Sequence, residues 1–272
     1  MNRSSLRDEP LLPRDESHFV FFIFSAFGAP FSFPLVRALL YHVSRLIAQM
    51  LFAPFVKIRV LRPQVACRKG AWILAANHIS HFDPPLLGIA ARHKIDWMGM
   101  VELFQIPVLA GWLRVIDTFP VDRARLDRQA VRIALTRLRA GHAVGVFPEG
   151  GIRDGSRSVL EGAPTRPGVA GLSQMTGAPI IPCVIMGSDR CYVLPRLWRP
   201  GRRIPVWIAF GSPLPPVAGK DRALARSALE ANLSDAFREL AVEMRLHFHL
   251  TGDDLPQSPI RRRAKPQAPS LP

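Results

Sequence analysis

Five short, largely apolar runs in the middle of the chain constrain the fold more than any other feature of the sequence. They lie at residues 72–76, 95–100, 143–147, 180–185 and 205–210. Runs of this length and composition are typical of short buried strands. The sequence therefore predicts that these five segments form strands.

Helical patterns alternate with these strands. One stripe of apolar residues at helical spacing ends before Gly141, a helix stop, and comprises Leu126, Ala130, Ile133, Ala134 and Leu138. A second helix is predicted at about 221–247, with a stripe of Leu229, Leu233, Ala236, Phe237, Leu240 and Met244. Alternation of this kind predicts an α/β fold, a layered sheet of mostly short buried strands flanked by helices.

The N-terminal region has a different composition. Residues 1–17 are polar and mixed in charge, residues 19–36 carry no charge, and residues 38–56 carry only His42 and Arg45 as basic groups. Pro30 and Pro34 interrupt the apolar stretch, so we expect two helices, at about 19–29 and 35–53, in a membrane-associated hairpin over 18–57. Two alternatives stay open, a pair of core helices and a cleaved signal peptide, although acidic residues at 8, 9, 15 and 16 disfavour the peptide.

Charge and cysteine usage limit partners and location. The chain has 36 Lys and Arg against 21 Asp and Glu, a net charge of +15, which favours nucleic acid, lipid headgroups or a phosphorylated substrate as partners. Basic residues follow the apolar start, so the positive-inside rule places the main domain, 58–251, at the cytoplasmic face of a membrane. Three cysteines without C-x-x-C spacing fit a reducing compartment rather than a disulfide framework or zinc site. The basic, Pro-rich segment 252–272 is predicted to be disordered.

A polar segment stands at the end of the first predicted strand, where sites of α/β proteins usually form. It reads NHISHFDP over residues 77–84 and runs into a second proline that favours the start of a helix. Histidine titrates near neutrality, which makes His78 a candidate general base, and a carboxylate such as Asp83 would fix its tautomer and stabilise its cation. Residues five apart on a helix point about 140° apart, so this pair requires a turn.

Two other roles for these residues stay open. Asp83, immediately before Pro84, is also a good helix N-cap. His78, His81 and Asp83 could instead ligate a metal, although no further tightly spaced His or Asp group supports a metal site.

Four sequence blocks follow one another along the chain: NHISHFDPP at 77–85, TFPVDR at 118–123, FPEGG at 147–151 and APIIPCVI at 178–185. In this order they resemble the blocks of the glycerolipid acyltransferases, the family of 1-acylglycerol-3-phosphate acyltransferases. The resemblance covers about residues 70–190. One block alone would be weak, whereas four in order with plausible spacing are specific.

The resemblance implies a role for each matching residue. His78 is similar to the family's general base and Asp83 to its orienting partner. Arg123 resembles the residue that grips the acceptor's phosphate. Glu149 and Gly150 match the block that helps to hold the acceptor.

Elementary chemistry supports part of this assignment. A guanidinium binds phosphate through paired hydrogen bonds, although Arg123 taken alone would pass for a surface arginine. The glycines beside Glu149 allow close backbone approach to a ligand, although a simple turn with an exposed Glu149 has the same sequence. Pro182 matches the family's fourth block, which the resemblance ties to the acyl donor or to structure.

The third block departs from the family's usual pattern. The family commonly has Glu-Gly-Thr-Arg-Ser, whereas this chain runs EGGIR over 149–153. The arginine, Arg153, stands one place late, and Arg157 or Arg166 could supply the charge instead. The exact acceptor is correspondingly less defined.

Together the patterns predict an O-acyltransferase of phospholipid biosynthesis. The expected reaction moves a fatty acyl group from acyl-CoA or acyl carrier protein, as co-substrate, onto the hydroxyl of lysophosphatidic acid or a similar lyso-lipid, with membrane lipids as surroundings and no cofactor. The sequence has no G-x-S-x-G elbow, dinucleotide fingerprint or P-loop. Two rivals stay open: a metal-dependent hydrolase using His78, His81 and Asp83, and a non-catalytic basic protein that binds membranes or nucleic acid. Nucleic acid is disfavoured because aromatics do not interleave the basic stretches.

Overall fold

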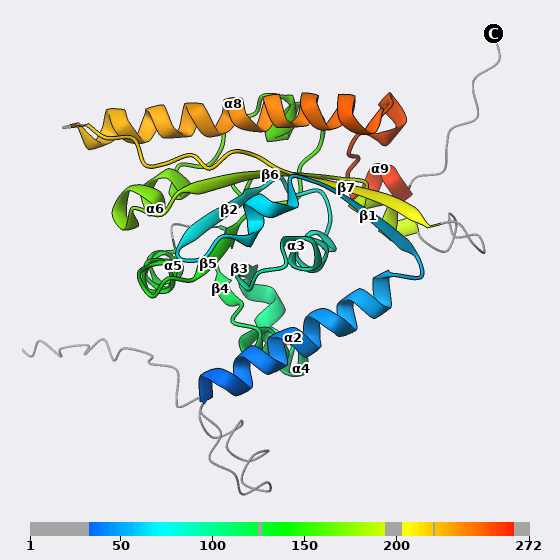
Figure 1. Ribbon diagram of the computed structural model, residues 1–272, viewed down its shortest axis with the longest axis horizontal. Helices are drawn as coiled ribbons and strands as arrows, with labels where there is room; N and C mark the ends of the chain where they lie inside the picture. The colour runs from blue at the N-terminus through cyan, green and yellow to red at the C-terminus, as the bar shows by residue number, and fades with distance from the viewer. Residues whose placement is uncertain (1–32, 125–126, 194–202, 220, 264–272) are drawn as a thin grey trace, which may run out of the picture. The chain divides into compact units, whose positions relative to one another are not determined.

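The computed structural model of the chain describes residues 33–124, 127–193, 203–219 and 221–263. Its contacts define two compact units, Met1–Ala38 and Leu39–Pro272, and the description below concerns the second. Within the described residues, seven strands form one sheet in the order β1-β7-β6-β2-β5-β3-β4 (Figure 1). The strands are β1 Val56–Leu61, β2 Trp72–Ala76, β3 Ile95–Met100, β4 Phe119–Val121, β5 Ala143–Val146, β6 Ile180–Met186 and β7 Ile204–Phe210.

Strand β2 lies in the middle of the sheet. Its residue Ile73 is paired with Val144 of β5 on one side and with Ile180 of β6 on the other. All neighbouring strands are parallel except β6 and β7, which run antiparallel. The loop after β2 therefore lies at the edge of the sheet where the carboxyl ends of several parallel strands converge.

Helices cover both faces of the sheet (Figure 1). The helices and 3-10 turns are α2 Phe33–Phe52, α3 Asp83–Ala91, α4 Pro107–Val115, α5 Arg128–Arg139, α6 Gly168–Thr176, η5 Ser188–Val193, α8 Arg222–Phe248, η6 Gly252–Asp254 and α9 Pro259–Arg263, with further short turns between them. Ile73 and Ala75 of β2 pack in one hydrophobic cluster with α5, α6 and α8, and Trp72, Leu74 and Ala76 pack in a second with α3. Because successive strand residues point to opposite faces and all five are buried, β2 requires an unbroken apolar sequence. The predicted layered α/β architecture is confirmed.

The five predicted strands are all present. Segments 72–76 and 95–100 coincide with β2 and β3, and the other three differ from the observed strands by one residue at an end. The sequence pattern does not reveal β1 or β4. Only Val56 of the six β1 residues is buried, and Lys57 and Arg59 interrupt its apolar character, while β4 has three residues. An exposed edge strand carries no continuous apolar signal.

Helix α2 corresponds to the second helix of the predicted N-terminal hairpin. The first, at 19–29, and the polar segment 1–17 lie outside the described residues. Tyr41 of α2 donates from its hydroxyl to the carbonyl of His93 at 3.1 Å, and the Arg45 guanidinium donates to the carbonyl of Ile89 at 3.4 Å. In the part of the chain that the structure describes, no helix is long and apolar enough to cross a membrane.

The prediction of disorder from residue 252 onward is wrong for residues 252–263. This segment contains η6 and α9, and residues 264–272 lie outside the described part of the chain. The Asp254 carboxylate pairs with Arg190 at 2.6 Å, and the amide of Ser258 donates to Asp154 at 2.8 Å. Composition indicates polarity but not these specific long-range partners, which hold the segment against the domain.

Candidate active site

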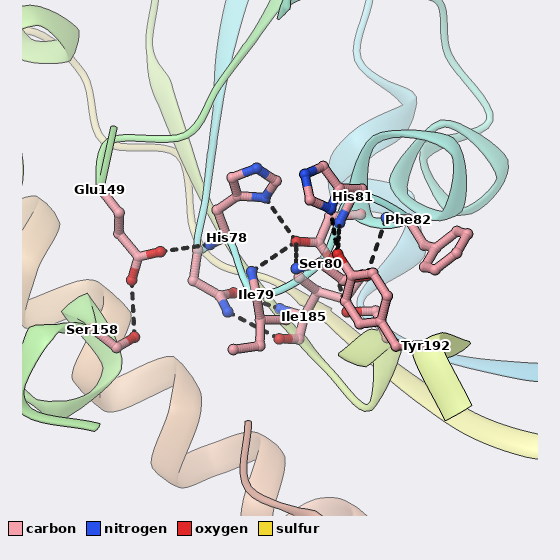
Figure 2. A network of polar contacts seen from close by, with 12 residues as sticks. His78, Ile79, Ser80, His81, Phe82, Glu149, Ser158, Ile185 and Tyr192 are labelled. Carbon is pink, nitrogen blue, oxygen red and sulfur yellow. Dashed lines mark hydrogen bonds and ion pairs between the residues drawn. The ribbon is translucent and has the colours of Figure 1, made fainter. Parts of the chain in front are cut away.

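The loop between β2 and α3 brings His78 and Asp83 together. Its start is fixed by Asn77, whose side-chain amide donates to the carbonyl of Ile185 at 3.0 Å and accepts from its N–H at 2.8 Å. His78 Nδ1 lies 2.9 Å from Asp83 Oδ2 (Figure 2). Both side chains are buried, Asp83 completely. The turn that a histidine–carboxylate dyad requires is therefore present.

Donors surround the Asp83 carboxylate. Oδ2 also accepts from the N–H groups of Ile79 and Ser80, each at 2.8 Å, and Oδ1 accepts from the hydroxyl of Ser188 at 2.5 Å. The N-cap position of α3 is Phe82, and no side-chain hydrogen bond caps that helix. The alternative of Asp83 as an N-cap is therefore wrong, because its carboxylate binds the loop that precedes the helix. These bonds fix its orientation and compensate its buried charge.

The imidazole of His78 is positioned by ring stacking as well as by the contact of Nδ1 with Asp83. Its ring stacks on Phe147 with 4.1 Å between centroids, and Phe147 stacks on Trp97 at 5.3 Å. Since Nδ1 faces Asp83, Nε2 is the nitrogen left to meet a substrate. The stack also makes the wall beside the imidazole apolar.

A pocket of about 330 Å³ opens from the dyad. His78 lines one part of it and Arg123 another, and most of the remaining lining is apolar side chain from β3, α2, α3 and α4, including Trp97, Leu109, Trp112 and Leu113. An apolar cavity with a few convergent polar groups suits an amphiphilic ligand. The pocket therefore combines a basic nitrogen, a cation and space for a hydrocarbon chain.

Glu149 lies behind the dyad. Its carboxylate accepts from the N–H of His78 at 2.6 Å and from the hydroxyl of Ser158 at 2.8 Å (Figure 2). It also accepts from the N–H of Val159 at 2.9 Å. Burial raises the pKa of Glu149 from 4.5 to about 7, against the opposing effect of these hydrogen bonds. Glu149 is buried, with 7% of its surface exposed, so the alternative of an exposed Glu149 in a simple turn is wrong. It is also not among the described residues that line the pocket.

Gly150 and three arginines surround the next part of the loop. Gly150 has a φ of 69°, and a Cβ there would lie 2.3 Å from Nε of Arg166, so glycine lets that side chain cross the turn. The Arg166 guanidinium donates to the carbonyl of Arg123 at 3.4 Å. Arg153 contributes its backbone N–H, which donates to the carbonyl of His78 at 2.9 Å. The structure thus places Arg166 beside Arg123.

Arg123 itself is half-buried at the pocket. Burial lowers the pKa of its guanidinium and the nearby charge of Arg166 lowers it further, while Glu102 acts in the opposite direction. The charge of Arg166 acts on Arg123, and two neighbouring guanidinium groups favour an anion close to them. This is the chemistry expected of a phosphate site.

Comparison with known proteins agrees with the four blocks. Residues 57–186 match the family model described as Acyltransferase. This segment is an acyltransferase-family domain. The family inferred from the sequence resemblance is therefore confirmed.

The relatives and the fold neighbour of this acyltransferase domain have closely related names. A 1-acyl-sn-glycerol-3-phosphate acyltransferase of Bacillus subtilis (strain 168) is 29% identical over 119 residues, 43% of this chain and 57% of the relative. One of Streptococcus pneumoniae (strain ATCC BAA-255 / R6) is 28% identical over 81 residues, 29% of this chain and 31% of the relative. The chain therefore aligns with less than two thirds of either protein. The crystal structure of the 1-acyl-sn-glycerophosphate (LPA) acyltransferase PlsC from Thermotoga maritima shares the fold, with a TM-score of 0.59 at 21% identity, over 82% of this chain and 88% of that one.

Pro182 of the acyltransferase domain lies within the sheet. It is paired with Ala75 of β2, and its carbonyl accepts from the N–H of Gly211 at 2.8 Å. It is not among the described residues that line the pocket. Its position at the centre of the sheet is that of a structural residue.

Several contacts of the site carry no signal in the sequence motifs. Ser188 bonds to Asp83 across 105 positions, and the Tyr192 hydroxyl accepts from the backbone N–H of His81 at 2.8 Å and bonds to its ring. Within the described residues, no group of three His, Cys, Asp or Glu side chains is placed to hold a metal ion. His81 is directed to Tyr192, so the structure does not assemble the ligand set of the metal alternative.

Proposed function

We propose that this protein is a lysophosphatidic acid O-acyltransferase that uses acyl-CoA or acyl carrier protein as the acyl donor. The observation that carries the proposal is the contact between His78 and Asp83 at one end of an apolar pocket that Arg123 also lines. The names of the relatives point to the same acceptor. The reaction class follows from a base, a phosphate-binding cation and room for an acyl chain in one place.

The dyad supplies general-base catalysis. Nε2 of His78 takes the proton of the acceptor hydroxyl as its oxygen attacks the thioester carbonyl carbon, and Asp83 stabilises the imidazolium that forms. The tetrahedral intermediate collapses with cleavage of the carbon–sulfur bond. The leaving thiolate takes the proton from His78, which yields the ester and a free thiol and restores the neutral base.

The two ends of the substrates occupy chemically different parts of the site. The apolar lining takes the acyl chain, because burying each methylene group contributes about 0.8 kcal/mol. Arg123 and Arg166 bind the acceptor's phosphate. Glu149 and the backbone N–H of Arg153 hold the His78 loop from behind, and neither acts on the substrate.

A membrane surface is the source of the lyso-lipid acceptor. Exposed apolar side chains gather on α2 and α4: Leu46 is 51% exposed, Met50 66%, Val108 87% and Trp112 45%. The Trp112 indole donates to the hydroxyl of Ser44 at 3.1 Å, which ties the two helices together beside the pocket. Such a surface inserts into the headgroup region of a bilayer, and the basic charge of the domain places it at the cytoplasmic face.

An acyl-transfer assay tests the proposed function. Purified protein is incubated with a thioester donor and either lysophosphatidic acid or monoacylglycerol, and the products are identified by mass spectrometry. We expect phosphatidic acid from the first acceptor. Arg123→Ala should lower kcat/KM for lysophosphatidic acid about 10- to 1000-fold, and Arg123→Lys should restore only part, because an ammonium lacks the guanidinium's paired donors. No transfer by the wild type to any phosphorylated acceptor would refute the function.

A flotation assay tests the membrane surface. We expect the wild type to float with anionic vesicles in high salt, since apolar insertion is not screened by salt. Met50→Glu combined with Val108→Glu should abolish flotation. Leu246→Glu is the matched control, because Leu246 is 71% exposed but lies on α8. Equal flotation of the double variant and the wild type would contradict the assignment of α2 and α4.

A further inference from the structure

The turn after β6 directs a buried serine at the dyad. Gly187 has a φ of 87°, and a Cβ there would lie 2.5 Å from the carbonyl oxygen of Pro205, so only glycine allows the chain to turn at this point. The next residue, Ser188, opens η5 and is completely buried. Its hydroxyl donates to Asp83 Oδ1 at 2.5 Å. Ser188 lies two residues beyond the segment that matches the family model.

The two oxygens of the Asp83 carboxylate have different partners. Oδ2 accepts from His78 and from two backbone N–H groups of its own loop, whereas Oδ1 accepts from Ser188. The loop donors hold only one oxygen, so they constrain the rotation of the carboxylate less than contacts to both oxygens do. The hydroxyl of Ser188 fixes that rotation from another element of the fold. It also withdraws part of the negative charge that His78 experiences.

We propose that Ser188 is a positioning residue of the dyad, which orients the Asp83 carboxylate and moderates its charge, and so sets the strength of His78 as a base. This inference rests on the proposed function, in which His78 is the base. It assigns Ser188 no contact with substrate.

Other ionisable groups near His78 and Asp83 could also contribute to the pH dependence of the activity. Among the described residues, the titratable and charged groups near the dyad are Arg45, His81, Arg123, Glu149, Cys183, Asp189, Cys191 and Tyr192. Burial raises the pKa of Cys183 well above its ordinary value and that of Cys191 to about 12, so both thiols stay neutral near pH 7. Burial raises the pKa of Glu149 to about 7, so Glu149 titrates in the same range as a histidine. A comparison between Ser188 variants and the wild type leaves these groups unchanged.

Removal of the Ser188 hydroxyl should make His78 a stronger base but leave the Asp83 carboxylate, and with it the imidazole, less well oriented. In Ser188→Ala, Asp83 carries more uncompensated charge, so it stabilises the imidazolium and raises the pKa of His78. The acidic limb of the kcat/KM profile should move up by about half a pH unit. We expect kcat to fall about 5- to 50-fold, with KM little changed, because a charge-assisted hydrogen bond is lost away from the substrate.

A second buried serine gives a matched control. Ser173 is also completely buried and donates to the carbonyl of Ala178 at 2.6 Å, on α6 and away from the dyad. Ser173→Ala should lose stability without a change in the pH profile. A purely structural Ser188 predicts the same for Ser188→Ala. Ser188→Cys retains a weak donor in nearly the same volume, so it should fold even if the alanine variant does not. Its acidic limb of the kcat/KM profile should lie between those of the wild type and Ser188→Ala.

The decisive measurement is the NMR titration of the His78 imidazole without substrate, assigned with His78→Gln. An upward shift in Ser188→Ala or Ser188→Cys, absent in Ser173→Ala, supports the proposal. An unshifted His78 in both Ser188 variants, with kcat at the wild-type level, overturns it. This readout needs no turnover, so a wild type that transfers no acyl group would refute the proposed function without deciding the role of Ser188.

Discussion

Among the described residues of the acyltransferase domain, two histidine–aspartate contacts lie at opposite ends of the parallel strands. His78 Nδ1 lies 2.9 Å from Asp83 after the carboxyl end of β2, and His142 Nδ1 lies 2.8 Å from Asp96 at the amino ends of β5 and β3. These strands are parallel, so the two pairs face different edges. By distance alone either pair could be a dyad.

Their surroundings separate them. Asp83 receives its other hydrogen bonds from two backbone N–H groups and a hydroxyl, all neutral. Asp96 lies 3.6 Å from the Lys94 ammonium and 3.5 Å from the Arg137 guanidinium, and both cations also contact Asp117. Permanent cations already compensate the charge of Asp96, so little of it is available to stabilise an imidazolium.

The two histidines also differ in what they can reach. His78 is buried and lines an apolar pocket, while the side chain of His142 is 39% exposed and lines no part of that pocket. Neutral donors on the carboxylate and a cavity beside the imidazole therefore distinguish the His78 pair as the candidate base. The second pair is a stabilising charge cluster.

The largest expected difference comes from removing each imidazole. General-base catalysis contributes about 10²–10⁴-fold, so His78→Ala should lose that much acyl transfer. His142→Ala should keep activity within about twofold, because Lys94 and Arg137 still neutralise Asp96. Steady-state assays of both folded variants, checked by circular dichroism, measure this. Comparable losses in the two variants would abolish the distinction.

Exchanging each carboxylate for an amide comes next. Asp83→Asn should lower kcat about 10²–10³-fold, since an amide neither stabilises the imidazolium nor secures the tautomer. It should also lose stability, because an amide N–H₂ must face one of the donors around Asp83. Asp96→Asn should cost about 1–3 kcal/mol of unfolding free energy while the folded fraction keeps its kcat. Denaturant titrations and kcat of both variants decide between these outcomes.

Sequence and structure agree where the signal is local and continuous. The buried runs of β2 and β3 and the apolar stripes of α5 and α8 identify those elements. Burial on both faces of a strand, or on one face of a helix, requires apolar residues at consecutive or regularly spaced positions, which the sequence shows directly. The first and third blocks locate His78, Asp83 and Glu149. The family's pattern suggests that Glu149 holds the acceptor, whereas the structure turns its carboxylate toward the backbone of His78.

Long-range partners have no such signal. Ser188 and Asp83 are 105 positions apart, and a lone serine after a strand resembles any other. The contact of Arg166 with Arg123 likewise depends on the passage of the Arg166 side chain over Gly150, which the sequence does not show. The polar composition of 252–263 conceals its attachment for the same reason.

Glu149 is a further buried carboxylate next to the dyad, and among the described residues it is paired with no cation like those around Asp96. Its pKa of about 7 lies above the ordinary 4.5, so the folded state binds this proton more tightly than the unfolded state. The associated stability is complete below about pH 4.5 and is lost as pH rises through 7, a fall of about 3 kcal/mol. Glu149→Gln does not titrate, so its stability should change less over this window. Urea titrations of both proteins at pH 5 and 8 measure the change in unfolding free energy between these pH values. An equal change in the wild type and in Glu149→Gln would contradict the prediction.

The smallest expected effect concerns the support of the dyad from the C-terminal segment. Arg190 of η5 pairs with Asp254 at 2.6 Å, with side chains 15% and 20% exposed, and also donates to the carbonyl of Asp253 at 3.0 Å. Asp254→Asn keeps an acceptor for the N–H of Thr251 but loses the ion pair, which should cost about 1 kcal/mol.

The same change should reach the chemistry, because η5 also carries Ser188, which bonds to Asp83. A looser η5 should lower kcat about two- to fivefold with KM unchanged, since the acceptor and donor contacts are elsewhere. Asp235→Asn is the matched control: Asp235 pairs with Arg238 on the exposed surface of α8, where side chains are 53% and 57% exposed, so we expect no measurable change in stability or kcat. If Asp254→Asn loses stability but keeps the wild-type kcat, η5 is rigid without the C-terminal segment. In that case the turn at Gly187 and the sheet suffice to position Ser188, and the C-terminal segment does not contribute.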